Sequence, residues 1–240
     1  MVQLFKKFKR SFDFIKRRAD NLKHMAKSSH NPPADSRQAL LLAARRVFAD
    51  RGFEGATVKD LADEAGVNVS LVSYYFGGKE GLYRECLLNF AEERWQTILR
   101  ILKPAESPDE LRTRLQLLAE EMAEVHVKEP DLCRIIHRDI QTLTPAVVDV
   151  FKNGFFKIFE TLVTFLKSAE KKGLTRPLKD HELTASLVMG SLLNLLQSDP
   201  HRKILGRPSI SDPKYRAAAL NHWLDFTYHG LENQGEQEKK

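Results

Sequence analysis

The sequence predicts an all-α fold, with three helices gathered in a head near the N-terminus and a larger helical body after them. Apolar residues recur at three- and four-residue intervals through most of the 240 positions, whereas the Val-, Ile- and Thr-rich alternation of strands is nearly absent. Glycine and proline signals divide this pattern into helix-sized pieces. We therefore expect three segments: an extension at residues 1–30, the head at residues 34–80 and the body at residues 81–234.

The composition is that of a folded, soluble protein, with 29% charged and 42% hydrophobic residues. The most apolar stretch, residues 185–196, is interrupted by polar residues and is too short to cross a bilayer. The basic start of the chain lacks the apolar core of a secretory signal. Cys86 and Cys133 lie far apart without a metal-ligand spacing. We expect a cytoplasmic protein with reduced thiols, no metal and no cofactor.

The net charge of +6 is a property of the N-terminal extension, because residues 1–27 hold nine Lys or Arg and only two Asp. The rest of the chain is close to neutral, so the alkaline pI of the whole chain does not indicate what the body binds. Apolar residues recur every three or four positions and predict a basic amphipathic helix over residues 2–26. They are Phe5, Phe8, Phe12 and Ile15.

The first helix of the head is expected at about residues 35–51. An Asn-Pro-Pro sequence at residues 31–33 separates it from the extension, and Gly52 supplies a C-terminal stop signal. Apolar residues at three- and four-residue intervals give this helix one apolar face, which packs in the core of the head. These residues are Leu40, Leu41, Ala44, Val47 and Phe48.

Two short helices at about residues 58–65 and 69–76 have the features of a helix-turn-helix. The Thr57 hydroxyl is placed to cap the first helix, and Gly66 permits the left-handed backbone of the turn. A long helix then begins at Lys79 and continues to about residue 103. By itself, this pattern also fits an ordinary helical hairpin.

The second short helix has one buried and one exposed side. Val72 and Phe76 are four residues apart and are expected to face the core. This spacing leaves the outer side of the helix free to contact a partner. The outer residues are Ser70, Ser73 and Tyr74, together with Val69 and Tyr75.

Residues 52–62, 65–68 and 74–83 together resemble the N-terminal signature of the TetR family of transcriptional regulators. The resemblance implies that the second short helix enters the major groove of DNA and that residues around it contact phosphates. The side chains expected at phosphates are those of Thr57, Tyr75 and Lys79, and those expected at base edges are Ser70, Ser73 and Tyr74. Val69, at the start of the same helix, completes the set of DNA-contact candidates.

The predicted recognition helix contains no Arg or Lys, so it lacks the side chains that read guanine with two hydrogen bonds. Apolar contact with thymine methyl groups and hydrogen bonds from Ser70 and Ser73 are the modes that remain. We therefore expect an operator with A·T content at the positions this helix contacts. A selected site rich in G there would contradict this expectation.

Turn signals divide residues 104–240 into five further helices, which are rich in Leu and Phe and can bury a core of their own. The resemblance implies that this body binds a small ligand whose occupancy changes DNA binding. Core packing is the alternative role of each pocket candidate. The candidates are Trp95, Met122, His126, His137, Phe151, Phe155 and Phe159.

The resemblance also implies a homodimer, because one head reads one half-site and two heads must lie about 34–36 Å apart or a multiple of that distance. The last two long helices, at about residues 180–198 and 213–231, resemble the pair that forms the family's dimer interface. Core packing is again the alternative for each candidate. The candidates are Leu183, Leu187, Leu192, Leu195, Leu220, Trp223, Leu224 and Phe226.

Together these features predict a sequence-specific DNA-binding regulator, a repressor that a small-molecule effector releases from a palindromic operator. The alternative is a ligand-independent protein of the same fold that coats or tethers DNA through its basic extension. For the extension itself, three roles stay open: packing on the body or a partner subunit, contact with DNA phosphates, and contact with an anionic membrane surface. Disorder and a true start at Met25 are also open. No nucleophile with a base, phosphate loop or metal cluster suggests an enzyme.

Overall fold

The computed structural model describes residues 34–142 and 144–232, and the elements in these two ranges are helices. The predicted all-α fold is therefore confirmed, and the predicted amphipathic helix at residues 2–26 lies outside the part that is described. In chain order the elements are α2 (Ala34–Gly55), α3 (Val58–Ala65), α4 (Ser70–Phe76), α5 (Lys79–Ile101), α6 (Pro108–Lys128), α7 (Pro130–Asp139), α8 (Pro145–Val150), the π-helix η1 (Phe151–Phe155), α9 (Phe156–Lys171), α10 (His181–Gln197), α11 (Asp199–Ile204) and α12 (Pro213–Leu231).

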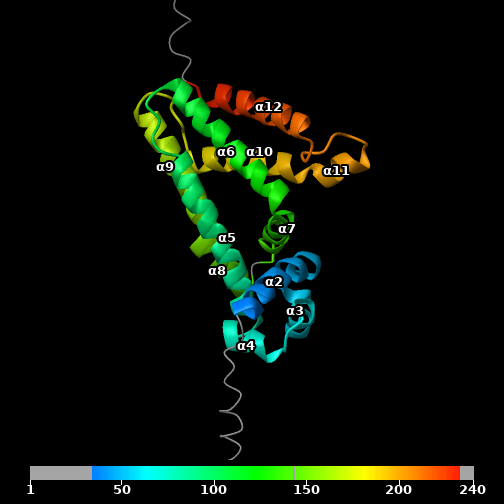
Figure 1. Ribbon diagram of the computed structural model, residues 1–240. Helices are drawn as coiled ribbons and strands as arrows, with labels where there is room; N and C mark the ends of the chain where they lie inside the picture. The colour runs from blue at the N-terminus through cyan, green and yellow to red at the C-terminus, as the bar shows by residue number, and fades with distance from the viewer. Residues whose placement is uncertain (1–33, 143, 233–240) are drawn as a thin grey trace, which may run out of the picture.

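The helices form a small head and a larger body that the long helix α5 connects (Figure 1). Helices α2, α3 and α4 gather at one end, whereas α10 and α12 lie at the opposite end with α6 and α9. Helix α7 lies between α6 and α2, so it stands at the junction of head and body. Among the helices described, none has both the length and the apolar character needed to span a membrane.

Side-chain caps explain where several body helices begin. The Ser107 hydroxyl accepts a hydrogen bond from the Glu110 backbone N–H at 3.2 Å, and Pro108 occupies the first turn of α6, where its missing N–H is not needed. The Asp180 carboxylate accepts from Leu183 N at 2.9 Å at the start of α10. Both caps are local, since each joins residues that are three positions apart.

In the head, Gly52 bends α2 near its C-terminal end. Its φ of 75° lies in the left-handed region, which glycine adopts without the penalty that a Cβ atom brings. The predicted stop after residue 51 is thus a kink, since helical hydrogen bonding resumes and continues to Gly55. The kink redirects the chain toward Thr57, where α3 begins.

Two clusters of buried side chains form the core, and α5 contributes to both. The head cluster includes Leu40, Phe48 and Tyr83, but also Leu132 of α7 and Val147 of α8. The body cluster is centred on the helices at the other end and includes Ile98 of α5. Because helices of the body complete the core of the head, a displacement of α7 or α8 acts directly on the packing of the head.

A π-helical turn, η1, joins α8 to α9 where this segment crosses α5. A Cβ atom added to Gly154 of η1 would lie only 2.8 Å from Ala91 Cβ on α5, closer than two carbon atoms can approach. A residue without a side chain is therefore required for the two backbones to come this close. The extra residue of the π turn also changes the directions of Phe151 and Phe155, which face the interior.

Candidate nucleic-acid interface and effector pocket

The start of α3 is fixed by a reciprocal pair of hydrogen bonds between Thr57 and Asp60. Asp60 N donates to Thr57 Oγ1 at 3.1 Å, and Thr57 N donates to Asp60 Oδ2 at 3.0 Å. The Thr57 hydroxyl also donates to Asp60 Oδ2 at 2.7 Å. These hydrogen bonds from Thr57 are the main reason that the pKa of the Asp60 carboxyl is lowered. The exposed Thr57 hydroxyl is thereby held at the surface of the head.

The turn between α3 and α4 depends on Gly66 and Asn68. Gly66 adopts a φ of 66°, the left-handed conformation expected for the turn. The Asn68 side-chain oxygen accepts hydrogen bonds from Ser70 N at 2.9 Å and Ser70 Oγ at 2.7 Å. Asn68 therefore caps the start of α4, because Val69, between Asn68 and Ser70, already has helical backbone angles.

Helix α4 turns a continuous polar and apolar surface outward. Val72 is fully buried in the head core, and Phe76 is half-buried. On the opposite side Ser70 and Ser73 are exposed, and Tyr74 is 63% exposed. Val69 directly before the helix is exposed as well, whereas Tyr75 is half-buried. The outer side of α4 therefore consists of the residues that the helical spacing indicates.

Lys79 has a structural role that the sequence did not indicate. Its Nζ donates hydrogen bonds to the carbonyl oxygens of Phe53 at 2.8 Å and Ala56 at 3.0 Å. The ammonium also lies 4.5 Å from the centroid of the Phe53 ring, a cation–π distance. Since an ammonium has three N–H groups, only one of them stays available for a phosphate.

Lys59 is a surface cation that the sequence reasoning missed. It lies in the first turn of α3, two residues after Thr57, and is exposed. Arg46 and Arg51 nearby form ion pairs with Glu64 and Asp60, whereas no ion pair of Lys59 occurs within the described ranges. Lys59 could have been identified from the sequence, because it lies two residues after Thr57, a predicted phosphate contact.

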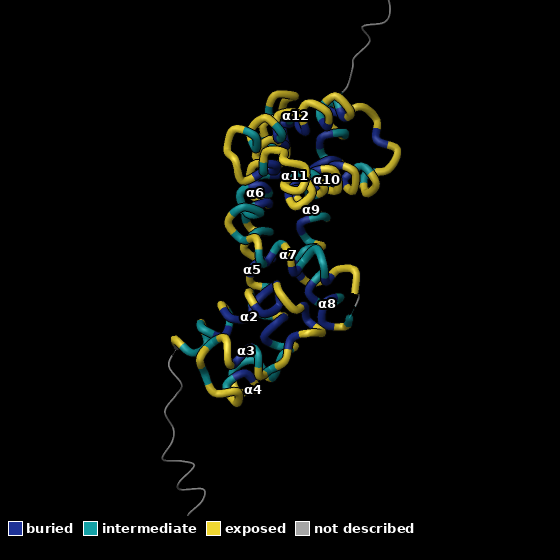
Figure 2. The backbone as a smooth tube through the Cα atoms, turned by 90° about the vertical axis from the view of Figure 1, so that its right-hand side faces the viewer, coloured by how far each residue is buried: buried dark blue, intermediate teal, exposed yellow. Residues whose placement is uncertain are grey.

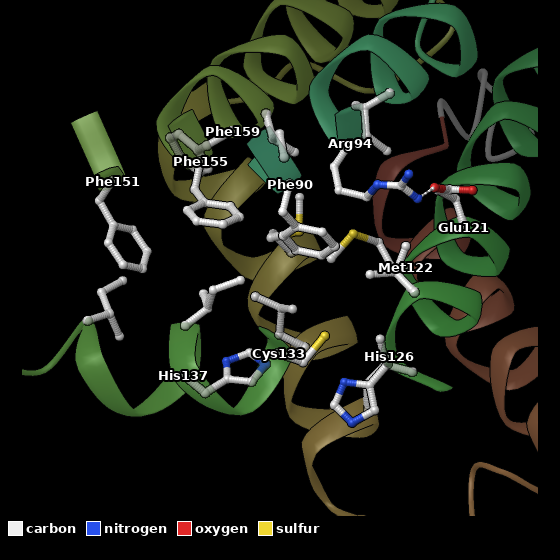
Figure 3. Close-up of a pocket in the computed structure, with 18 residues that line it drawn as sticks. Phe90, Arg94, Glu121, Met122, His126, Cys133, His137, Phe151, Phe155 and Phe159 are labelled. Atoms are coloured by element: carbon white, nitrogen blue, oxygen red, sulfur yellow. Dashed lines mark hydrogen bonds and ion pairs between the residues drawn. The ribbon is translucent and has the colours of Figure 1, made fainter. Parts of the chain in front are cut away.

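A cavity of about 190 Å³ lies in the body where α5, α6, α7, η1, α9 and α10 meet (Figure 3). Phe90, Phe155 and Phe159 lie on one side of it, and Cys133 lies opposite them with the two histidines (Figure 3). Six of the seven candidates from the sequence line this cavity. They are Met122, His126, His137, Phe151, Phe155 and Phe159.

Trp95, the seventh candidate, does not line the cavity. The side of α5 that faces the cavity carries Phe90, Arg94 and Ile98, which are spaced four residues apart. Trp95 is one residue further along and therefore points about 100° away around the helix. Its indole N–H donates to Thr161 Oγ1 on α9 at 3.2 Å. Helical spacing identifies such faces, but it does not indicate which face meets the cavity.

The polar groups of the cavity carry no unbalanced charge. Arg94 Nη1 lies 2.9 Å from Glu121 Oε1 in an ion pair on the wall. Burial lowers the pKa of His126, and burial together with His126 lowers the pKa of His137 to about 4. Burial also raises the pKa of the Cys133 thiol to about 11. At neutral pH both imidazoles and the thiol are therefore uncharged.

Helix α7 connects the cavity to the head. Cys133, Ile136 and His137 line the cavity. Arg138, the next residue, instead donates from Nη1 to the Ala49 carbonyl on α2 at 2.8 Å. Neighbouring residues of α7 therefore contact the candidate ligand site and α2, the helix that packs against α3 and α4 of the helix-turn-helix.

The sequence of the head matches a known family. Residues 40–86 match the model described as "Bacterial regulatory proteins, tetR family". The chain is 36% identical over 100 residues to the HTH-type transcriptional repressor KstR2 of Mycolicibacterium smegmatis, across 42% of this chain and 49% of that protein. Residues 40–86 therefore form an N-terminal domain of the TetR type. The chain spans about half the length of this curated relative.

Solved structures share the TetR-like architecture beyond the head. The fatty acid degradation regulator FadR of Bacillus halodurans superposes with a TM-score of 0.65 at 18% identity, over 81% of this chain and 99% of that chain. FadR of Bacillus subtilis, solved in complex with stearoyl-CoA, gives a TM-score of 0.63 at 15% identity over the same shares. At these identities the likeness concerns the fold, and it confirms a helical body behind the TetR head.

The dimer-interface candidates on α10 and α12 fall into three groups by their exposure. Much of α10 and α12 is exposed (Figure 2). Leu183, Leu187 and Phe226 are among the exposed residues, with exposed fractions of 66% for Leu187 and 75% for Phe226. Leu195 is half-buried. The remaining four point into the body cluster, because these helices also pack against the chain's own core. They are Leu192, Leu220, Trp223 and Leu224, and for them core packing is the better explanation.

Proposed function

We propose that this TetR-family protein is a sequence-specific transcriptional repressor that reads DNA with α4 in the major groove. The observation that carries the proposal is the division of α4 between Val72, which is fully buried, and an outer side of Ser70, Ser73 and Tyr74. A helix anchored in this way presents side chains to base edges at a fixed angle. The match to a family of regulators and the similarity to a repressor support it.

Phosphate contacts would fix the position of α4 on the duplex. Thr57, Tyr75 and Lys79 are the candidates from the resemblance, and Lys59 joins them as an exposed cation at the start of α3. Because α4 itself has no cation, these surrounding residues supply the electrostatic part of the affinity. Apolar and hydroxyl contacts from Val69, Ser70 and Ser73 then favour A·T pairs.

Two repressor heads would bind a palindromic operator as a homodimer formed through α10 and α12. Leu183, Leu187 and Phe226 give these helices an apolar surface that no other part of the described chain covers. Burial of such side chains against a second copy is favourable, at about 25 cal/mol per Å² of apolar surface. A two-fold arrangement of heads then matches a two-fold operator.

An effector in the body cavity would release the repressor through α7. The cavity and the head are in contact with the same helix, so a ligand that displaces Ile136 or His137 changes the position of Arg138 against α2. An effector changes DNA affinity only to the extent that it binds one arrangement of α7 better than another. The stearoyl-CoA complex of the structural neighbour FadR supports a ligand in a body of this fold.

The test is selection of bound sites from random duplex DNA at near-physiological salt. Full-length protein is compared with a Ser73→Ala/Tyr74→Ala variant and with a Thr164→Ala/Lys167→Ala variant on the exposed side of α9 as the matched control. We expect a palindromic motif that the α4 variant loses and the α9 variant keeps. A chain lacking residues 1–27 is run in parallel. If the full-length protein binds DNA without selecting any motif, and this binding is lost when residues 1–27 are removed, the proposal is contradicted and DNA coating is favoured.

A further inference from the structure

The size of the cavity limits what it can hold. A cavity of about 150 Å³ lined by Leu, Ile and Phe side chains is large enough for one benzene molecule. At about 190 Å³, the cavity of this protein exceeds that volume only slightly. A long acyl chain is several times larger than benzene, whereas a single ring with one or two small substituents matches the volume of this cavity.

The lining of the cavity favours a flat apolar skeleton. Phe90, Phe151, Phe155 and Phe159 surround it, and Phe151 and Phe155 pack with their ring centroids 5.3 Å apart. Met122 adds a thioether, which packs well against ring edges. Aromatic rings prefer offset and edge-to-face contacts with other rings, and walls of this kind offer them to a bound ring.

The charges in the cavity disfavour an ionic ligand. The guanidinium of Arg94 is already paired with Glu121, and the two imidazoles are neutral at pH 7. An anion that enters must leave water without gaining an unpaired cation, which costs several kcal/mol in an apolar site. A neutral ligand avoids this penalty.

The histidine pair of the cavity has hydrogen-bonding capacity to spare, as does the buried Nε of Arg94, which has no partner among the described residues. The rings of His126 and His137 face each other with centroids 6.3 Å apart and form no direct hydrogen bond. Gln197 Nε2 lies 2.7 Å from His137 Nδ1 and 3.1 Å from His137 Nε2, whereas no hydrogen bond of His126 occurs within the described ranges. A neutral imidazole has one donor and one acceptor nitrogen, and a hydroxyl group also donates and accepts. A hydroxyl therefore matches this pair of rings better than a carbonyl or an ammonium does.

We propose that the effector cavity binds a small phenol-type alcohol, with its single ring among the phenylalanines and its hydroxyl at His126 and His137. The inference rests on the proposed function, since it names the ligand class of the same cavity. The hydroxyl satisfies nitrogen atoms of the histidine pair, and the ring fills the apolar volume. The hydroxyl contact reaches His137 of α7, the helix that also contacts the head.

The test is isothermal titration calorimetry of the full-length protein with three probes of one shape: p-cresol, toluene and 4-methylbenzoate. We expect p-cresol to bind at one molecule per chain and toluene to bind about tenfold more weakly, because one hydrogen bond is lost. No heat is expected for 4-methylbenzoate. A His126→Leu variant should bind p-cresol and toluene equally, while His222→Leu on the exposed side of α12 keeps the tenfold preference. The midpoint of thermal unfolding verifies that both variants fold.

Stearoyl-CoA is titrated as a fourth probe, to compare a long-chain ligand with p-cresol. A Leu193→Trp variant is also measured, because Leu193 lines the cavity and a larger side chain there should abolish p-cresol binding. Tighter binding of 4-methylbenzoate or stearoyl-CoA than of p-cresol, or an unchanged preference in His126→Leu, would overturn the inference. The site selection described above distinguishes the two failures. A palindromic motif without binding of p-cresol rejects only the ligand class, whereas p-cresol binding without a motif rejects the repressor.

Discussion

Arg138 on α7 donates a hydrogen bond from Nη1 to the carbonyl oxygen of Ala49 on α2, 2.8 Å away. Nη2 of the same guanidinium donates to the Phe48 carbonyl, and Nε donates to Asp139 Oδ1 at 2.8 Å. Asp139 in turn accepts a hydrogen bond from the Tyr83 hydroxyl at 3.1 Å. The side chains of Arg138 and Asp139 thus join α2, α5 and α7 at the junction of head and body.

We expect Arg138→Met to lower the free energy of unfolding by about 2 kcal/mol, because it leaves the Asp139 carboxylate buried without its cation. Asp139 is only 2% exposed, whereas part of the guanidinium reaches solvent, which moderates the loss. Arg134→Met is the matched control, since Arg134 pairs with the exposed Asp50 at 3.2 Å, and a change of at most about 0.5 kcal/mol is expected. Urea denaturation measures both. If both variants lose the same free energy of unfolding, Arg138 contributes no more than an ordinary surface ion pair.

Gly52→Ala should destabilise the head by about 1–2 kcal/mol. The φ of 75° is unfavourable for a residue with a Cβ atom, and the added atom would lie 3.3 Å from Arg138 Nε. Gly55→Ala, three residues further along, meets only Arg51 Cβ at 3.6 Å and should be neutral or slightly stabilising. Thermal unfolding of the two variants under one condition decides the point, and a stable Gly52→Ala protein would exclude strain at the kink.

Lys79→Met should change two measurements at once. Loss of the hydrogen bonds to Phe53 and Ala56 lowers the free energy of unfolding by about 1–3 kcal/mol. If its remaining N–H contacts a phosphate, the negative slope of log affinity for DNA against log salt concentration also becomes shallower by about 0.9. Lys59→Met should make that slope shallower by the same amount and leave the free energy of unfolding unchanged. An unchanged slope in both variants would remove these lysines from the DNA contact.

Leu187→Glu should convert a dimer into a folded monomer, because Leu187 is 66% exposed on α10 and a carboxylate there cannot be buried against a second copy. Light scattering after size-exclusion chromatography measures the mass. Leu117→Glu on α6 serves as the control, since Leu117 is also an exposed leucine, at 43%, but lies outside the proposed interface. Dimers of unchanged stability in both variants would rule out this surface.

Lowering the pH should destabilise the protein through His137. Its pKa is about 4 in the folded chain and near the ordinary 6.5 when unfolded, so the unfolded chain binds the proton first. The free energy of unfolding therefore decreases as the pH falls from about 6.5 to about 4, by at most about 1.4 kcal/mol per pH unit. Denaturation at several pH values measures the slope. A His137→Phe variant should have a shallower slope in this window, and an identical slope would mean that His137 does not contribute.

The head could be predicted well from the sequence because its signals are local. Thr57, Gly66 and Asn68 each determine a cap or a turn within three residues of their own position, and the family signature lies in one continuous region. The outer side of α4 follows from helical spacing once Val72 is assigned to the core. Such features do not depend on how distant helices pack.

The cavity and the junction were less accessible to sequence reasoning, because they depend on the rotation of each helix about its axis. Arg94 lines the cavity while Trp95 beside it does not, and Leu187 is exposed while Leu192 is buried. Arg138 could not be identified, since its partners are backbone carbonyls on α2 that carry no residue-specific signal. Only the packed structure assigns such roles.

The close approach of Gly154 to Ala91 gives the two sides of the cavity different stiffness. On one side, Gly154 of η1 lies against the small side chain of Ala91 and the end of Leu88 on α5, which leaves little room to rearrange. On the other side, α7 contacts the head through larger side chains, those of Leu132 and Arg138. We therefore expect a molecule that enters the cavity to displace α7 more readily than η1, and so to act in the direction of the head.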